Sequence, residues 1–233
     1  FDTFNYKKIF FFKDKHMSII VERFNKIKSN ITSLKSPKPL NIIAVSKTFP
    51  LTHIRPLIDY GHNHFGENKV QETISKWSII NKKEREDINL HMIGKLQSNK
   101  AKDAIKHFDY IHSLDNQKLA DALFKNQNNL NKNLKYFIQV NIGNELQKSG
   151  IPVNELDAFY NYCTKEISLN ILGLMVIPPN EKNTKQYFKS LNELNTSLAL
   201  KDLSMGMSAD YMDAIRYGAT FVRIGSSIFG SRS

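Results

Sequence analysis

Short apolar stretches alternate with helix-like stretches along almost the whole chain, and this alternation limits the possible folds more than any other feature. The strand-like stretches are residues 40–46, 62–65, 90–93, 110–114, 136–142, 171–177, 203–206 and 220–225. The helix-like stretches that follow them are residues 51–60, 67–80, 98–107, 116–130, 154–167, 184–198, 210–217 and 226–229. Alternation of this kind indicates a parallel sheet. Eight units in 233 residues predict an α/β fold with a single closed (β/α)8 TIM-type barrel rather than an open doubly wound sheet.

A further helix-like stretch, residues 17–34, precedes the first strand and carries apolar residues at helical spacing. The last helix-like stretch is short, so we expect this N-terminal helix to cover the gap that it leaves. No linker or change of composition divides the remainder. The sequence therefore predicts one barrel domain, residues 17–233, after an N-terminal extension, residues 1–16.

The extension is basic and aromatic but also contains Asp2 and Asp14. It has no apolar segment of signal-peptide length and no small-residue cleavage site. Cys163 is the single cysteine, so a disulfide framework and a cysteine-type zinc cluster are excluded, and a reducing compartment fits. We expect a cytoplasmic protein, with an organelle-targeting remnant at the N-terminus as the alternative. The longest apolar runs are too short to span a bilayer.

The formal net charge of +11 raises the possibility of nucleic-acid binding. The basic residues are mostly lysines scattered among asparagines, as in residues 126–135. There is no arginine-rich block, basic aromatic strand or zinc-finger spacing. We therefore interpret the charge as a bias of solvated faces that favours small anionic ligands, and do not predict nucleic acid as the main ligand.

Three motifs fall at the predicted ends of strands, which is where the active sites of barrels lie. Lys47 ends the first strand, "SMGMS" (204–208) follows the seventh, and "RIGSS" (223–227) follows the eighth. Taken alone, a strand-end lysine is usually solvated and a Gly-Ser-Ser segment is usually a turn. Their common placement instead suggests an amine and a phosphate cradle at one rim, and hence a phosphorylated aldehyde such as pyridoxal 5′-phosphate (PLP).

The residue types suit this chemistry. A lysine condenses with an aldehyde through its neutral amine, which a partly buried site favours. A phosphate dianion is held well by backbone N–H groups at a helix start. Gly225 allows the backbone to approach closely, and Ser208, Ser226 and Ser227 offer hydroxyl donors.

At these motifs the chain resembles the YggS/PROSC family of pyridoxal phosphate homeostasis proteins, whose barrel is like that of alanine racemase. The resemblance runs from about residue 42 to residue 232, and the extension lies outside it. It is carried by "AVSKT" (44–48), "FGENKVQE" (65–72), "HMIGKLQSNK" (91–100), "IHSLD" (111–115), "QVNI" with "ELQKSGI" (139–151), "GLM" (173–175) and "LSMGMSADYMDAI…GATFVRIGSSIFGSR" (203–232).

The resemblance implies a role for each residue at the matched positions. Lys47 would carry the internal aldimine, Arg223 would face the pyridine nitrogen, and Asn68 would sit near the cofactor ring. The remaining residues would hold the phosphate (Ser208, Gly225 and Ser226) or line the pocket (Met205 and Gly206). It also implies a monomer that binds PLP and supplies it to recipient apoenzymes, with no strong turnover.

Four histidines lie on or beside predicted strands. His62 and His64 alternate on one face and could suggest a metal pair, but no third ligand is near, so we expect packing or hydrogen bonding. His91 and His112 are expected to reach the rim as hydrogen-bond partners.

Other residues with reactive or bulky side chains have simpler interpretations. Glu67 and Glu72 could form an acid–base pair, but at a helix start we expect them to favour the helix dipole. Cys163 is predicted to be a buried thiol in a helix, and Trp77 a packing residue.

The alternative function is that of a PLP-dependent amino-acid racemase-like enzyme. A racemase needs a second base opposite the lysine, and alanine racemase-like enzymes supply it with the help of a second domain. The chain ends directly after the phosphate motif, so we expect no such domain.

Overall fold

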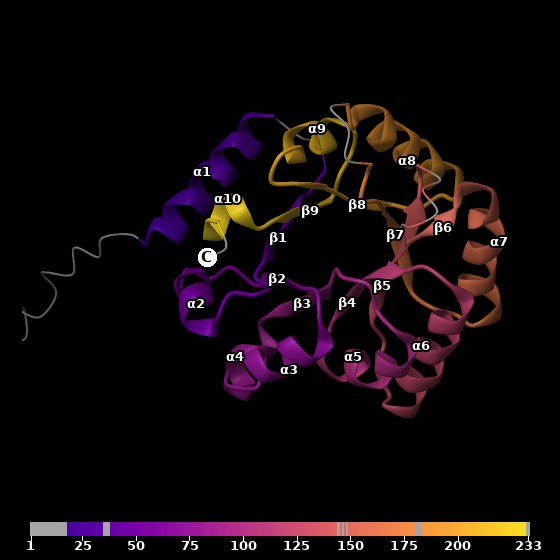
Figure 1. Cartoon of the computed structure of the whole chain (residues 1–233), viewed down its shortest axis with the longest axis horizontal. Helices are drawn as coiled ribbons and strands as arrows, with labels where there is room; N and C mark the ends of the chain where they lie inside the picture. The colour runs from indigo at the N-terminus through magenta and orange to yellow at the C-terminus, as the bar shows by residue number, and fades with distance from the viewer. Residues whose placement is uncertain are drawn as a thin grey trace, which may run out of the picture.

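The computed structural model describes residues 18–34, 38–143, 145, 147, 149–179 and 183–231, so the predicted extension lies outside the described residues. Within them, parallel strands close into a barrel in the order β1, β2, β3, β4, β5, β7, β8, β9 and back to β1 (Figure 1). The strands are β1 Asn41–Val45, β2 His64–Glu67, β3 Asn89–Met92, β4 Tyr110–Leu114, β5 Lys135–Asn141, β7 Ile171–Met175, β8 Asp202–Met207 and β9 Phe221–Ile224. A short strand, β6 (Ile151–Pro152), pairs with β5 alone. The predicted (β/α)8 barrel is confirmed.

The helices form a ring around the barrel (Figure 1). They are α1 Ile19–Ser33, α2 Leu51–Asp59, α3 Val70–Trp77, α4 Lys82–Glu86, α5 Ala101–His107, α6 Gln117–Asn129, α7 Leu156–Asn161, α8 Lys185–Ser197, α9 Tyr211–Arg216 and α10 Ser226–Phe229. A 3₁₀ turn, Ser98–Lys100, precedes α5, and a π-helical turn, Tyr162–Glu166, continues α7. Among the described residues, no helix is long and apolar enough to cross a membrane.

Helix α1 packs against α10 and α2, as expected for a helix that covers the short end of the last unit. The Ser18 side chain accepts a hydrogen bond from the backbone N–H of Ile20 and so caps the helix start. Its apolar face is buried through Ile20, Val21, Phe24 and Ile27. The spacing of these residues explains why this segment forms a helix and which side it presents.

Two differences from the sequence prediction lie in the second unit. The predicted helix over residues 67–80 begins only at Val70, because Glu67 belongs to β2. The additional helix α4 follows α3, and Asn81 caps it by accepting from the backbone N–H of Glu84.

The core has two layers, as barrels do. One large cluster lies between the strands and the surrounding helices. A smaller cluster fills the barrel interior, and its members are Ile43, Tyr110, Phe137, Met175 and Phe221. Between β7 and β8 the chains approach so closely that a Cβ on Gly173 would lie 1.7 Å from the carbonyl oxygen of Asp202.

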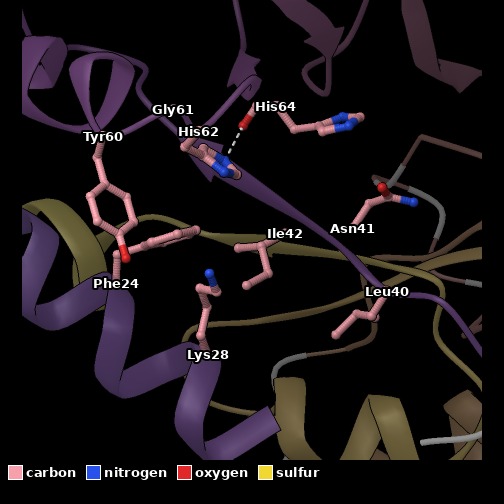
Figure 2. A pocket seen from close by; sticks show the side chains of 9 residues that line it. All are labelled: Phe24, Lys28, Leu40, Asn41, Ile42, Tyr60, Gly61, His62 and His64. Carbon is pink, nitrogen blue, oxygen red and sulfur yellow. Dashed lines mark hydrogen bonds between the residues drawn. The ribbon is translucent and has the colours of Figure 1, made fainter. Parts of the chain in front are cut away.

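Because all strands are parallel, the barrel has an amino end and a carboxyl end. At the amino end lies a pocket of about 270 Å³, which we call the amino-end pocket (Figure 2). It is lined by Phe24, Lys28, Leu40, Asn41, Ile42, Tyr60, Gly61, His62 and His64. At the carboxyl end lies a larger cavity, described next.

Candidate functional site

The carboxyl-end cavity has a volume of about 520 Å³ and is built from the residues that follow or end the strands. Six of the eight predicted site residues line it, namely Lys47, Asn68, Ser208, Arg223, Gly225 and Ser226. Its remaining walls are largely apolar and include Val45, Ile93, Ile177 and Met207. The structure thus brings together the three motifs that the sequence places at the ends of strands.

Met205 and Gly206 are not among the residues that line this cavity. Met205 is fully buried in the outer core, and a Cβ on Gly206 would lie 2.5 Å from the Cβ of Ala214. The pairing of β8 with β9 shifts register between Ser204 and Met207, and Gly206 has a positive φ of 90°. The shift breaks the simple alternation of faces, so that Met207 is the methionine that lines the cavity.

Lys47 is the second residue after β1 and is half-buried. The chain turns sharply behind it, since the backbone N–H of Phe49 donates to the carbonyl of Ser46. Thr48 in this turn has φ 69°, a conformation that β-branched residues rarely adopt. The residue after Lys47 is therefore in a strained backbone conformation, which persists only if surrounding contacts stabilise it.

A buried ion pair holds that segment from below. The ammonium group of Lys76 donates to the backbone carbonyl of Ser46 at 2.7 Å, and to the two carboxylate oxygens of Glu67 at 2.9 and 3.1 Å. The Thr48 backbone N–H donates to Glu72 Oε1 at 2.5 Å, and Glu72 also accepts from Lys76 at 3.2 Å. The residues before and after Lys47, Ser46 and Thr48, are thus hydrogen-bonded through their backbones to the charged side chains of Lys76 and Glu72.

Glu67 is the centre of this group, and the expectation that it serves a helix dipole is wrong. It is fully buried at the end of β2, where it also accepts from the Ser46 hydroxyl at 2.7 Å and from Trp77 Nε1 at 3.0 Å. Burial raises the pKa of its carboxyl, and the neighbouring Lys76 opposes that rise. Trp77 packs against Phe65 as expected, and in addition it donates this hydrogen bond.

The two serine-rich motifs meet in the wall of the cavity next to the end of β1. Ser208 Oγ lies 3.3 Å from the backbone nitrogen of Gly225 and 3.5 Å from that of Ser227, and accepts from both. A Cβ on Gly225 would lie 3.3 Å from the Cβ of Val45, so this turn packs tightly against the end of β1. Two backbone donors thus gather around one serine hydroxyl, and groups of this kind can hold an oxyanion.

Arg223 is buried at the floor of the cavity. Its guanidinium donates to Ser204 Oγ and to the carbonyl of Val176, both at 2.8 Å. Within the described ranges no carboxylate lies within ion-pair distance of it. Burial lowers its pKa to about 10, against the attraction of Asp210, so it remains charged at neutral pH. A buried cation without an anionic partner is unfavourable on its own and suits a site that receives an anion or a strong acceptor.

Asn68 reaches the cavity because the next strand leaves room for it. A Cβ on Gly94 would lie 2.4 Å from the backbone oxygen of Asn68. Glycine at this position therefore allows the segment after β2 to pass close to the segment after β3.

The histidines lie elsewhere. His62 Nε2 is hydrogen-bonded to the backbone oxygen of His64, and no group of three or more potential metal ligands occurs in the part of the chain that the structure describes. His91 and His112 do not reach the rim as expected but are fully buried inside the barrel. Their inward direction follows from strand alternation, since Leu90 and Met92 beside His91, and Ile111 beside His112, belong to the outer core.

Cys163 is buried in the π-helical turn that continues α7. Burial raises the pKa of its thiol to about 12, so it is inert at neutral pH. The prediction of a buried thiol in a helix is confirmed.

Comparison with known proteins assigns the chain to a family. Residues 23–233 match the family model described as "Alanine racemase, N-terminal domain". A pyridoxal phosphate homeostasis protein of Aquifex aeolicus is 39% identical over 82% of this chain and 86% of its own length. A protein of the same name from Escherichia coli K12 is 36% identical over 85% of this chain and 88% of its own.

Solved structures agree. PipY of Synechococcus elongatus is 36% identical, with a TM-score of 0.77 over 88% of this chain and all of its own, and is known both without and with PLP bound. Alanine racemase of Clostridium difficile is 14% identical and shares the fold, with a TM-score of 0.70 over 91% of this chain and 56% of its own. The chain belongs to the pyridoxal phosphate homeostasis protein family, whose barrel is that of the alanine racemase N-terminal domain.

Proposed function

We propose that this protein binds PLP as a Schiff base on Lys47 and serves in intracellular vitamin B6 homeostasis, without strong turnover. The observation that carries the proposal is the convergence of Lys47, the Ser208–Gly225 cradle and Arg223 on one cavity. Relatives that carry the homeostasis name, and the PLP-bound form of PipY, support the same cofactor.

The residues present fit PLP. When bound, this cofactor supplies an aldehyde that condenses with a primary amine, and a phosphate that carries up to two negative charges. Lys47 offers the amine, while Ser208 and the backbone N–H groups of Gly225 and Ser227 suit the phosphate. Arg223 offers N–H donors to the ring nitrogen, and the apolar walls suit an aromatic ring.

The same cavity supports weak rather than strong turnover. A guanidinium can only donate hydrogen bonds, so Arg223 has no acidic proton to share with a ring nitrogen at neutral pH. Among the described residues that line the cavity, Lys47 is the one side chain suited to act as a general base. Racemisation needs a base on each face of the cofactor, so the racemase-like alternative lacks one partner in this set.

We further propose that residues 17–233 form one domain after the extension 1–16, and that the protein is a cytoplasmic monomer that supplies PLP to recipient apoenzymes. The continuous ring of helices and strands supports the single domain. The homeostasis name of the relatives supports the supply of cofactor.

The test is covalent trapping. Purified protein incubated with PLP should show a visible absorbance band, and borohydride should fix the cofactor on the peptide that contains Lys47. Lys47→Ala should abolish both signals, whereas Lys69→Ala, which removes an exposed lysine near the same rim, should retain both. Mapping of the adduct to a different lysine would contradict the assignment.

A further inference from the structure

Three histidines form a hydrogen-bonded column inside the barrel. The column consists of His64 on β2, His91 on β3 and His112 on β4. Nδ1 of His64 lies 2.9 Å from Nε2 of His91, and Nδ1 of His91 lies 2.9 Å from Nε2 of His112. Each contact is short enough for a good hydrogen bond between ring nitrogens.

The column joins the two ends of the barrel. At its upper end, His112 Nδ1 lies 2.8 Å from Ser204 Oγ, which in turn accepts from Arg223 at 2.8 Å in the carboxyl-end cavity. At its lower end, His64 lines the amino-end pocket beside His62 (Figure 2). A continuous chain of polar side chains therefore crosses an otherwise apolar interior.

The two inner histidines are neutral. His91 and His112 are fully buried and stack on Tyr110 and Phe137, with ring centroids 4.2 and 4.4 Å apart. Burial lowers the pKa of both rings well below the ordinary value. A neutral imidazole has one donor and one acceptor nitrogen, so all bonds of the column must point in the same direction.

Arg223 selects that direction. Its guanidinium only donates, so Ser204 Oγ is an acceptor in this contact. If His112 also donated to Ser204, the buried hydroxyl proton would have no acceptor, because Arg223 and His112 are its side-chain partners among the described residues. A buried donor left without an acceptor destabilises the structure. Ser204 therefore donates to His112 Nδ1, and both inner rings carry their proton on Nε2.

We propose that Ser204, His112 and His91 are positioning residues, which fix the guanidinium of Arg223 so that its remaining N–H groups face the ring nitrogen of a bound pyridine ligand. The inference rests on the proposed function as far as that ligand is concerned. The Ser204 hydroxyl donates its proton to His112 Nδ1. The Ser204 oxygen is therefore oriented to accept the hydrogen bond from Arg223. The polarity of the column itself is a property of the protein alone.

The first measurement uses the full chain without ligand. Nitrogen NMR of histidine-labelled protein at neutral pH should show His91 and His112 as neutral rings protonated on Nε2. In Ser204→Ala the two rings should lose this single tautomer and show a mixture, whereas Ser204→Thr should retain it. Nδ1-protonated or doubly protonated rings in the wild type would overturn the proposed polarity.

Ser113→Ala is the matched control. Ser113 is also buried, next to His112 in the sequence, and its hydroxyl has no recorded hydrogen-bond partner among the described residues. Its removal should leave the tautomers unchanged. The same change of tautomers in Ser113→Ala and Ser204→Ala would reduce the effect to general repacking and overturn the role of Ser204.

The second measurement adds PLP. In Ser204→Ala, the absorbance band should shift and the Kd should rise about tenfold, because Arg223 loses a charge-assisted hydrogen bond. An unchanged band and Kd would overturn the positioning role while the proposed function stood. Failure of the wild type to bind PLP would instead overturn the proposed function and the positioning role together, while the NMR result decided the polarity of the column separately.

Discussion

Lys76 donates to both carboxylate oxygens of Glu67, at 2.9 and 3.1 Å, directly beneath the strand end that carries Lys47. Both side chains are almost entirely removed from solvent. Burying two charges is costly, and the attraction between them offsets that cost only with good geometry and further hydrogen bonds. Ser46 and Trp77 supply those bonds to Glu67. The pair is thus a support for the half-turn that presents Lys47.

Removal of one partner should destabilise the fold strongly. Lys76→Met leaves the Glu67 carboxylate buried without its counter-ion, and we expect the free energy of unfolding to fall by about 3–5 kcal/mol. Urea denaturation at neutral pH measures this change. Lys189→Met is the control, because its ion pair with Glu193 is exposed and should contribute less than about 1 kcal/mol. Equal effects of the two substitutions would contradict the role assigned to Lys76.

Glu72 should control the turn at Lys47 more than it controls the fold as a whole. Glu72→Ala removes the acceptor of the exposed Thr48 N–H, which should cost about 0.5–1.5 kcal/mol and relax the positive φ of Thr48. We expect slower borohydride trapping of PLP on Lys47. Glu72→Gln keeps an oxygen acceptor and should restore most of the trapping rate. No difference between the two variants would show that the hydrogen bond to Thr48 does not position the lysine.

Much of the fold could be predicted because barrel units repeat a simple pattern. The apolar strand of residues 136–142 and the helix-like spacing of residues 17–34 lie close to the observed β5 and α1. The motif residues Lys47, Ser208 and Gly225 could be placed at one rim because parallel strands end on the same side. No knowledge of side-chain contacts was needed for this step.

The rest depends on contacts between distant residues. Sequence alone places Glu67 at the start of a helix-like stretch. Its partner, Lys76, lies nine positions later, and the two side chains meet only after α3 packs against β2. The inward direction of His91 depends on how β3 pairs with both neighbours. Met207 rather than Met205 lines the cavity because the pairing of β8 with β9 shifts register. Sequence periodicity does not predict such a shift.

The phosphate group should provide much of the affinity for PLP. Ser208→Ala removes one polar group from the cradle but leaves the backbone N–H groups of Gly225 and Ser227, so binding should weaken by about 1–3 kcal/mol. Unphosphorylated pyridoxal should bind far more weakly than PLP to the wild type. Ser75→Ala, on the outer surface of α3, is the control. Similar affinities for pyridoxal and PLP would show that the cradle is not a phosphate site. Titration followed by absorbance or fluorescence gives both affinities.

Stability should fall as the solution is acidified, because of the buried histidines. The pKa values of His91 and His112 are lowered by burial, so below about pH 6.5 the unfolded chain binds protons that the folded chain does not. Each ring should remove about 1.4 kcal/mol per pH unit below that point and contribute nothing above it. Urea denaturation from pH 8 to pH 5 should show a shallower slope for His91→Gln/His112→Gln than for the wild type. Comparison of slopes cancels the contribution of Glu67, whose raised pKa acts in the opposite direction. Equal slopes would contradict the neutral state of the column.

The PLP-loaded protein should not racemise or transaminate amino acids at enzymatic rates. Arg223 keeps its charge at neutral pH and can only donate, which disfavours protonation of a ring nitrogen and weakens the electron-withdrawing power of the ring. Lys47 is the one general base among the described lining residues, so proton removal and return would have to occur on one face. Slow exchange of amino acids with the Lys47 adduct is still expected, since it requires only an amine. Chiral analysis of alanine and a panel of other amino acids, with Lys47→Ala as the blank, measures the rate. Turnover within the roughly 1–10³ s⁻¹ typical of enzymes would overturn the homeostasis proposal in favour of a racemase-like enzyme.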